Sequence, residues 1–274
     1  MSEMITSAAN PLIKRVRALL GQRKHRQAEG AFVVEGIRAV WQALESDAEV
    51  EVLVVAPELL RSDITWELLA HRRRAGLRTV EVSSNVFGGM TEREHPSGLA
   101  AIVRMPERGL AELRVGAEAL FVALHEAGNP GNLGTILRTI DAVGGDGLIV
   151  VGDATDPYHP TSVKASMGAL FTVPLVRVHT MEEVLAWCRS GGIGVVTTSA
   201  GAWQLHWEAR YPRPGLLLMG SEGEGLAPEV LARGDLAVRI PMGGSADSLN
   251  LAVATGILLY EAKRPRVEHD PPRG

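Results

Sequence analysis

Hydrophobic and polar positions alternate in two ways along this chain, and each way predicts one kind of element. In residues 11–22, apolar side chains such as Leu12, Val16 and Leu19 recur at the spacing of one helix face. Short uninterrupted apolar runs, such as residues 147–151, instead predict strands that are buried on both faces. Because the two kinds of segment alternate, the pattern predicts an α/β protein whose C-terminal part holds a parallel sheet covered by helices on both sides.

The expected elements fall into two groups, separated by a charged segment near residues 106–115 that proline and glycine interrupt. The first group has helices over residues 11–22, 37–44 and 65–74, strands over 31–35, 50–56, 79–82 and 98–104, and a polar turn over 23–30. The second has strands over 119–124, 147–151, 172–176, 194–198, 215–219 and 237–240, and helices over 134–143, 162–169, 181–189, 228–232 and 249–262. We therefore expect one domain over residues 1–108 and a second over residues 109–274.

The composition is that of a globular protein with an ample core, since 46% of the 274 residues are hydrophobic and 22% are charged. No apolar run approaches the ~18–20 residues of a membrane-spanning helix, and the first ten residues lack the apolar stretch of a signal peptide. The single cysteine, Cys188, excludes an internal disulfide and a cysteine-based zinc site, and we interpret it as a buried core thiol. We expect a cytoplasmic protein.

The charge is unevenly distributed. The net charge of −4 argues against a protein that coats nucleic acid indiscriminately, yet residues 1–40 hold seven basic and three acidic side chains. A basic stretch on an acidic protein suits contact with phosphates. A solvated helix face would give the same pattern, so the charge alone leaves both interpretations open.

Three stretches rich in glycine and polar residues each follow a predicted strand, namely EAGNPGNLGTILR at 126–138, GSEGEGL at 220–226 and PMGGSADSLN at 241–250. Open α/β sheets bind ligands in loops at the carboxyl ends of their strands. A P-loop signature is absent, and the glycines near residue 145 precede a strand, so neither common nucleotide fingerprint is present. The eight histidines are scattered, so we expect no metal. A small-molecule enzyme of the doubly wound type is a weaker alternative.

The same stretches resemble the three motifs of the SpoU (TrmH-like) family of SPOUT-class RNA ribose methyltransferases, in the same order and spacing. They read NPGNLGTILRTIDAVG at 129–144, LLLMGSEGEGL at 216–226 and IPMGGSADSLNLAVATGILLYEA at 240–262. The N-terminal sequences ITSAANPLIKRVRALLGQRKHR at 5–26 and FVVEGIRAV at 32–40 are similar to the RNA-binding domain that precedes the catalytic domain in many members. The resemblance therefore covers nearly the whole chain.

The resemblance implies S-adenosylmethionine-dependent methylation of a ribose 2′-hydroxyl in RNA. Large-subunit ribosomal RNA is the favoured substrate, because this kind of N-terminal domain is commoner among ribosomal RNA enzymes. A transfer RNA methyltransferase, and a non-catalytic RNA-binding or ribosome-assembly protein of the same fold, are the alternatives. For the fold, the resemblance implies a ribosomal-protein-like α/β RNA-binding domain, then a parallel-sheet SPOUT α/β domain with a C-terminal trefoil knot. It also implies a homodimer.

For catalysis, the resemblance implies that Arg138 contacts the reacting nucleotide and assists removal of the hydroxyl proton. Because arginine is always protonated, we expect it to hold the adjacent phosphate and stabilise the developing oxyanion. Asn132 matches the asparagine that orients this arginine, with a helix N-cap as the alternative. Glu222 could orient Arg138 or Asn132, or cap a turn. Ser248 and Asn250 match the SLN of the last motif and should face the substrate pocket, with a helix cap as the alternative for Ser248.

The resemblance and the loop positions also give the expected binding residues. For the cofactor these are Thr198, Ser199, Ala200, Gly220, Ser221, Ile240, Met242 and Leu249. For RNA they are Lys14, Arg15, Arg23, Lys24 and Arg26.

Overall fold

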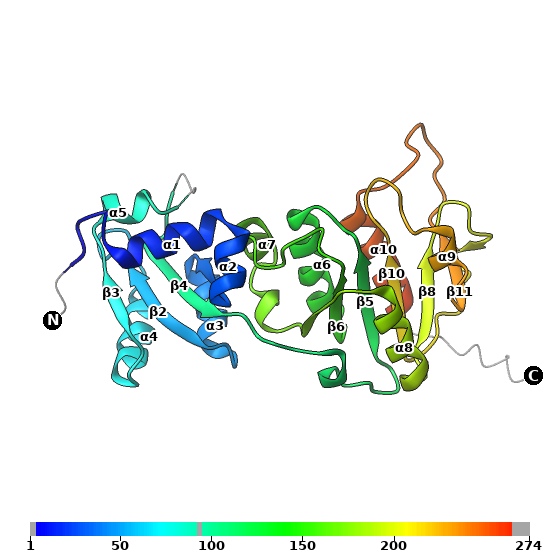
Figure 1. The fold of residues 1–274 in the computed structure, drawn as a ribbon, viewed down its shortest axis with the longest axis horizontal. Helices are drawn as coiled ribbons and strands as arrows, with labels where there is room; N and C mark the ends of the chain where they lie inside the picture. The colour runs from blue at the N-terminus through cyan, green and yellow to red at the C-terminus, as the bar shows by residue number, and fades with distance from the viewer. Residues whose placement is uncertain (1–3, 92–94, 265–274) are drawn as a thin grey trace, which may run out of the picture. The chain divides into compact units, whose positions relative to one another are not determined.

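The structure, a computed structural model, describes residues 4–91 and 95–264 (Figure 1). Its first elements are α1 (Pro11–Gly21), α2 (Arg23–Glu29), β1 (Ala31–Glu35), α3 (Ile37–Glu45), β2 (Val50–Val55), α4 (Asp63–Arg74), β3 (Thr79–Glu81), α5 (Ser84–Gly88), β4 (Leu99–Arg104) and the 3-10 turn η1 (Leu110–Glu112). The next are β5 (Leu120–His125), α6 (Pro130–Ala142), β6 (Gly147–Val151), α7 (Pro160–Ala165), η2 (Ala169–Phe171), β7 (Leu175–Val178) and α8 (Met181–Gly191). The last are β8 (Gly194–Thr198), β9 (Gln204–Leu205), β10 (Gly215–Met219), α9 (Pro228–Leu231), β11 (Leu236–Arg239) and α10 (Leu251–Lys263).

The chain forms two compact units, and each unit is made of three separate segments of the sequence. Unit 1 comprises Met1–Arg108, Asn129–Arg138 and Thr155–Pro174, and unit 2 comprises Gly109–Gly128, Thr139–Ala154 and Leu175–Gly274. Two segments from the region that carries the sequence motifs thus pack with the N-terminal region. The domain boundary at residue 108 stays a prediction.

Unit 1 is built on a four-stranded sheet in the order β1-β4-β2-β3. Strand β4 pairs antiparallel with β1 and β2, and β3 joins β2 in parallel after the α4 crossover. Helices α1 and α5 share a hydrophobic core with one face of the sheet, where Ile13, Val16 and Leu19 pack with Phe87. The helical spacing in residues 11–22 therefore identified Val16 and Leu19 correctly, whereas Leu12 of the predicted face is half-buried and the buried Ile13 was not part of the pattern.

The prediction of a polar turn over residues 23–30 is wrong, because residues 23–29 form helix α2. The buried residue of this helix is Arg26, so α2 has no apolar stripe for a periodicity argument to detect. Gly30 ends the helix with φ of 59°, a left-handed conformation that glycine adopts at little cost. Helix α2 is therefore anchored to the core by the buried guanidinium of Arg26, whose partner lies 130 residues away in the sequence.

That partner is Asp156, in the segment 155–174 that packs on the edge strand β1. Nε and Nη2 of Arg26 lie 2.8 and 2.6 Å from Oδ2 of Asp156, and the two residues are only 1% and 8% exposed. Next to this ion pair, the ring of Phe32 lies 4.7 Å from the ring of Tyr158 and 6.3 Å from that of Phe171. The segment between β6 and β7 is therefore part of the core of unit 1.

Unit 2 is built on a seven-stranded sheet in the order β7-β6-β5-β10-β8-β11-β9, and every pair in it is parallel. All residues of β6 and β10 are buried, as expected for strands covered on both faces. The α/β class with a parallel C-terminal sheet is confirmed. Because β8 lies between β10 and β11 and pairs with both in parallel, the carboxyl ends of β8, β10 and β11 are close together.

Some boundaries differ from the sequence prediction for local reasons. Strand β7 begins at Leu175 and not at residue 172, because Ala169–Phe171 form a 3-10 turn and Pro174 has no amide hydrogen for a ladder. Helix α6 begins at Pro130, a position where proline's missing amide hydrogen costs nothing. In the described part of the chain, no helix is long and apolar enough to cross a membrane. The trefoil knot stays a prediction.

Candidate functional site

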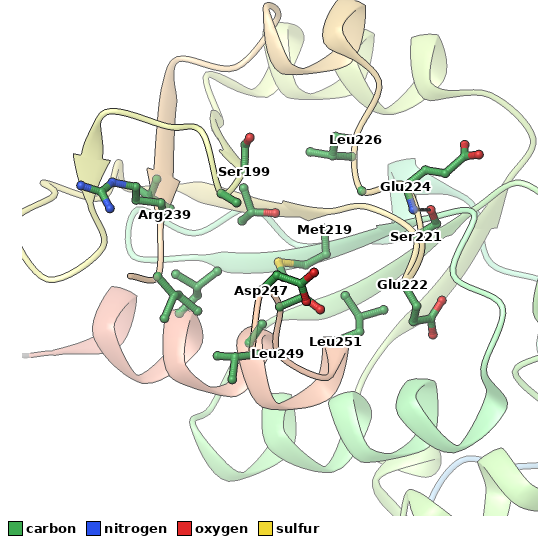
Figure 2. Close-up of a pocket in the computed structure, with 18 of the residues that line it drawn as sticks. Ser199, Met219, Ser221, Glu222, Glu224, Leu226, Arg239, Asp247, Leu249 and Leu251 are labelled. Carbon is green, nitrogen blue, oxygen red and sulfur yellow. Dashed lines mark hydrogen bonds between the residues drawn. The ribbon is translucent and has the colours of Figure 1, made fainter. Parts of the chain in front are cut away.

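Unit 2 contains a pocket of about 380 Å³ at the carboxyl ends of β8, β10 and β11, with the first turns of α10 as its floor (Figure 2). Its volume is within the ~300–1,000 Å³ range of small-molecule sites. The lining comes from residues 198–200 after β8, 221–226 after β10, and 240–249 after β11. The two later glycine-rich motifs therefore meet at one place, as the rule for parallel sheets predicts.

Seven of the eight residues expected to bind the cofactor line this pocket, namely Thr198, Ser199, Ala200, Ser221, Ile240, Met242 and Leu249. The eighth, Gly220, packs beneath it: a β-carbon on Gly220 would lie 2.1 Å from the carbonyl carbon of Gly225. No side chain fits in that space. The pocket thus unites the expected positions, and their contact with a cofactor stays a prediction.

The segment 221–225 is a tight turn that explains the glycines of the GSEGEG motif. The amide of Ser221 donates to the carbonyl of Gly225 at 3.2 Å, and the amide of Gly225 donates back at 3.1 Å. Gly225 has a φ angle of 70°, a backbone conformation that residues other than glycine rarely adopt. The hydroxyl of Ser221 also accepts a hydrogen bond from the amide of Glu224 at 3.2 Å. These bonds hold one wall of the pocket in place.

Glu222 connects this turn to the loop after β5. Its Oε2 accepts a hydrogen bond from the backbone amide of Gly128 at 3.0 Å, so the carboxylate joins the 221–225 turn to the end of the loop after β5, within unit 2. The roles expected for Glu222, orienting Arg138 or Asn132, stay predictions. The contact with Gly128 shows that this side chain also organises the backbone.

Asp247 lines the pocket and was missed by the sequence reasoning. Figure 2 shows its carboxylate toward the middle of the group of labelled side chains, whereas the side chain of Arg239 is directed away from that group. With Glu222 and Glu224, Asp247 gives the lining three carboxylates to one arginine. Its position inside the last motif, one residue before Ser248, was the available signal. Arg239 had no such signal, because it ends an ordinary strand.

The last motif also contains the cap of α10. Oδ1 of Asn250 accepts hydrogen bonds from the amides of Ala252 and Val253 at 2.9 and 3.3 Å, so α10 begins at Leu251 and not at residue 249. The cap considered for Ser248 therefore belongs to Asn250, a residue type that caps helices well. Ser248 lines the pocket, whereas Asn250 is an exposed helix cap beside it.

Asn132 and Arg138 lie on the part of α6 that belongs to unit 1. Oδ1 of Asn129 accepts hydrogen bonds from the amides of Gly131 and Asn132 at 2.8 and 3.2 Å, so the N-cap alternative for Asn132 is wrong. Asn132 is 9% exposed, whereas Arg138 is exposed. Six residues of helix separate them by about 9 Å along the axis and about 120° around it. The orienting role of Asn132 stays a prediction.

The five residues expected to bind RNA have different environments. Lys14 and Lys24 are exposed, and Arg23 is half-buried. Arg15 forms ion pairs with Glu29 at 2.6 Å and Glu51 at 2.8 Å, and the hydrogen bond with Glu51 is the main reason that the pKa of Arg15 is raised above its ordinary value.

The prediction that Arg26 binds RNA is wrong, because this side chain is buried in an ion pair. Besides the pair with Asp156, its Nη1 donates to the backbone carbonyl of Leu19 at 2.7 Å. A side chain that is 2% exposed and is paired with a buried carboxylate has no donor to offer an RNA phosphate. The basic cluster 23–26 thus mixes surface charge with one core charge.

Cys188 is buried in the core of unit 2, which confirms its interpretation as a core thiol. Burial raises the pKa of the thiol to about 12, so it is protonated at neutral pH. Among the described residues, no group of three or more histidine, cysteine, aspartate and glutamate side chains could hold a metal ion.

Comparison with known proteins finds two family matches that together span most of the chain. The model of the SpoU rRNA Methylase family matches residues 119–260. The model of the MRM3-like substrate binding domain matches residues 10–101. The segment 155–174, which packs with unit 1, lies inside the first match.

Individual relatives match over nearly their whole length. The 23S rRNA (uridine(2479)-2'-O)-methyltransferase of Streptomyces viridochromogenes is 35% identical, over 95% of this chain and 92% of its own. A crystal structure of an AdoMet-bound rRNA methyltransferase from Sinorhizobium meliloti superposes with a TM-score of 0.88 and 37% identity, covering 96% of this chain and 97% of that one. The AdoMet complex of the SpoU methyltransferase AviRb from S. viridochromogenes superposes with a TM-score of 0.84 and is 35% identical. The match covers 94% of this chain and 99% of that one.

Proposed function

Because this chain belongs to the SpoU rRNA Methylase family, we propose that it methylates a ribose 2′-hydroxyl in the ribosomal RNA of the large subunit. The resemblance inferred from the three motifs is thereby confirmed. The enzyme is an RNA 2′-O-methyltransferase that uses S-adenosylmethionine, as do the relatives whose structures contain it. Large-subunit RNA is proposed because two full-length relatives are named as 23S rRNA enzymes.

The observation that carries the proposal is the pocket at the ends of β8, β10 and β11. Its walls include Ile240, Leu249 and Leu251, apolar surfaces that suit a flat adenine ring. Its carboxylates suit ribose hydroxyls, which donate hydrogen bonds, and a cationic ligand. S-adenosylmethionine has both features and, when bound, supplies an electrophilic methyl group on a positively charged sulfur. The lining therefore fits this methyl donor.

The protein's own side chains have to position the ribose hydroxyl and take its proton. Arg138 is exposed on α6, where its guanidinium can bind a phosphate through two parallel hydrogen bonds. We assign it to the phosphate next to the reacting ribose and to the developing oxyanion. Asn132 is assigned to the same step, and Glu222, Ser248 and Asn250 to the organisation of the substrate pocket.

The test is methylation of an unmodified 23S rRNA transcript by the purified protein with S-adenosylmethionine. Mass spectrometry of nuclease fragments should locate one new 2′-O-methyl nucleotide. Methylation of transfer RNA in place of 23S rRNA would overturn the proposed substrate. Tight binding of S-adenosylmethionine by calorimetry, with no methylation of either RNA, would favour a non-catalytic RNA-binding protein.

Arg138→Ala should lower kcat about 10²–10³-fold, because removal of a preorganised charged donor has that effect. Affinity for S-adenosylmethionine should not change. Arg138→Lys should rescue little activity, since an ammonium cannot reproduce the guanidinium fork. Arg38→Ala, at an exposed arginine on α3, is the matched control and should retain activity. Near-normal single-turnover methylation by Arg138→Ala would refute this role.

We also propose a homodimer through the C-terminal part. Val253 and Tyr260 on α10 are 51% and 61% exposed, and seven residues of helix place them on the same face. An exposed apolar helix face is a common feature of subunit interfaces. Light scattering at micromolar concentration should give twice the monomer mass, and Tyr260→Glu should lower it. A monomeric mass for the unmodified protein would refute the dimer. The cytoplasmic location stays a prediction.

A further inference from the structure

Unit 1 has a cavity of its own, of about 220 Å³, which shares no lining residue with the pocket at the ends of β8, β10 and β11. It is bounded by Leu20 of α1, by Val33 and Glu35 of β1, and by residues 160–164 of α7. A narrower recess continues it toward Met90 and Thr91 and shares the walls formed by Leu20, Val33 and Glu35. The cavity is smaller than the ~300–1,000 Å³ typical of sites for drug-sized ligands, so it suits one ring system.

The walls combine two apolar surfaces with one carboxylate. Val33 and Val163 are each 4% exposed and Leu20 is half-buried, which gives surfaces against which a flat ring can pack. The carboxylate is that of Glu35, whose Oε1 accepts a hydrogen bond of 2.6 Å from the hydroxyl of Thr91. An ionised carboxylate has about four acceptor positions and no donor. The cavity is therefore built for a flat ring that donates hydrogen bonds.

The position of the cavity points to RNA as the ligand. Three of its walls, Leu20, Val33 and Glu35, lie in the region that matches the substrate binding domain. Lys164 and Thr161, on the α7 side, are exposed at the rim, where an ammonium can meet a phosphate. The methyl group of Thr161 lies 3.7 Å from where a β-carbon of Gly131 would be. The rim is thus next to the start of α6, the helix that carries Asn132.

We propose that this cavity binds one unpaired guanine of the substrate RNA, with Glu35 accepting from its Watson–Crick edge and Lys164 binding the adjoining phosphate. The proposal rests on the RNA methyltransferase function proposed above. Guanine presents two adjacent N–H donors, a match for a carboxylate. Adenine and cytosine place one amino group beside an acceptor nitrogen, and uracil places its one N–H between two carbonyl oxygens, so each would bring a repelling acceptor close to Glu35. Proteins that recognise single-stranded RNA read this edge of splayed-out bases.

The experiment measures binding of four fluorescent RNA decamers by anisotropy at fixed salt. Three are uridine decamers with one central guanosine, inosine or adenosine, and the fourth is all uridine. The guanosine decamer should bind about 10–100-fold more tightly than the all-uridine decamer, the discrimination that one good bidentate contact gives. Inosine lacks the amino donor of guanine, so its decamer should fall between these two, and the adenosine decamer should bind like the all-uridine one.

Glu35→Gln should abolish the preference for guanosine and leave the affinity for the all-uridine decamer unchanged. The glutamine carbonyl can still accept from Thr91, so the fold should persist. Leu20→Phe, which fills the cavity without touching the carboxylate, should also abolish the preference. Glu45→Gln, at an exposed carboxylate on α3, is the matched control and should retain it.

Equal binding of all decamers by the unmodified protein would overturn the proposal, as would a guanosine preference that survives in Glu35→Gln. These results are separate from the proposed function, which is tested by methylation of the 23S transcript. A protein that methylates 23S rRNA without any decamer preference would retain its function and lose this site. A protein that neither methylates RNA nor binds any decamer would lose both.

Discussion

The buried ion pair between Arg26 and Asp156 should contribute strongly to the stability of unit 1. Asp156→Asn tests this with little change in shape, because the asparagine oxygen can still accept the hydrogen bond of 3.0 Å that Oδ1 of Asp156 accepts from the amide of Tyr158. The guanidinium of Arg26 would remain buried, with its carboxylate partner gone. An uncompensated buried charge is the reason that such substitutions are costly.

The expected magnitude follows from burial. The two side chains are 2% and 7% exposed, and removal of one partner of a buried pair destabilises a protein by about 3–5 kcal/mol. The ion pair between Arg73 and Glu81, at 3.1 Å, is the control, because its side chains are 41% and 28% exposed. Exposed pairs contribute roughly 0–1 kcal/mol. Glu81→Gln should therefore have a small effect in the same unit.

The double variant Arg26→Met with Asp156→Leu should be less destabilised than Asp156→Asn. Buried pairs can often be replaced by apolar residues at little net loss, but here the carbonyls of Leu19 and Leu20 would lose their donor and the amide of Tyr158 would lose its acceptor. Each lost hydrogen bond costs about 1 kcal/mol. With three hydrogen bonds lost, the double variant should be destabilised by about 3 kcal/mol, at the low end of the range for Asp156→Asn.

The assay is urea unfolding followed by fluorescence, together with hydrogen–deuterium exchange of peptides from β1 and from residues 155–165. Exchange is needed because a chain with two units need not unfold in one step. Asp156→Asn should speed exchange in both peptides, and 0.5 M salt should change its effect little, because buried pairs are weakly screened. A loss no larger than that of Glu81→Gln would refute the reasoning.

Three further predictions concern Gly220, the exposed lysines Lys14 and Lys24, and Cys188. Gly220→Ala should weaken S-adenosylmethionine binding at least tenfold in calorimetry, because its β-carbon would displace the 221–225 turn; unchanged affinity would show that the turn can move. Lys14→Ala with Lys24→Ala should weaken 23S rRNA binding and lower the slope of log affinity against log salt by up to about 2, whereas an unchanged slope would make these lysines a solvated face. For Cys188, the thiol ionises at a pH of about 9 in the unfolded chain and about 12 in the folded protein, so the free energy of unfolding should fall as pH rises between these values. Cys188→Ala should make that fall less steep in urea unfolding. An equally steep fall in the variant would contradict the prediction.

The strands of unit 2 were predicted within a few residues, because a strand buried on both faces is visible as a local apolar run. Strand β6 was predicted with its observed bounds, Gly147–Val151. The short strand β9, Gln204–Leu205, was not predicted. Its two residues pair with β11, and no local pattern distinguishes them from a loop.

The sequence predicted which residues gather at one pocket where those residues follow strands, and it failed where distant contacts decide a residue's environment. Ser199, Ser221 and Ile240 line one pocket because parallel strands bring their carboxyl ends together. Arg26 was placed with the RNA contacts because its neighbours are basic. Its burial depends on Asp156, which is 130 residues away in the chain, and no pattern within residues 23–30 contains that information.

The same distant contacts link the N-terminal region to α6, the helix that carries Asn132 and Arg138. Segment 155–174 lies between two strands of the methylase sheet, yet its packing partners are α2 and β1. A β-carbon at Gly134 of α6 would lie 2.3 Å from the carbonyl oxygen of Ser162 in α7, so the two helices meet at van der Waals contact. The ion pair with Arg26 holds the start of that segment, and α7 in turn supports the part of α6 that carries Asn132 and Arg138. The region that matches a substrate binding domain is therefore also packed, through segment 155–174, against the helix that carries Asn132 and Arg138.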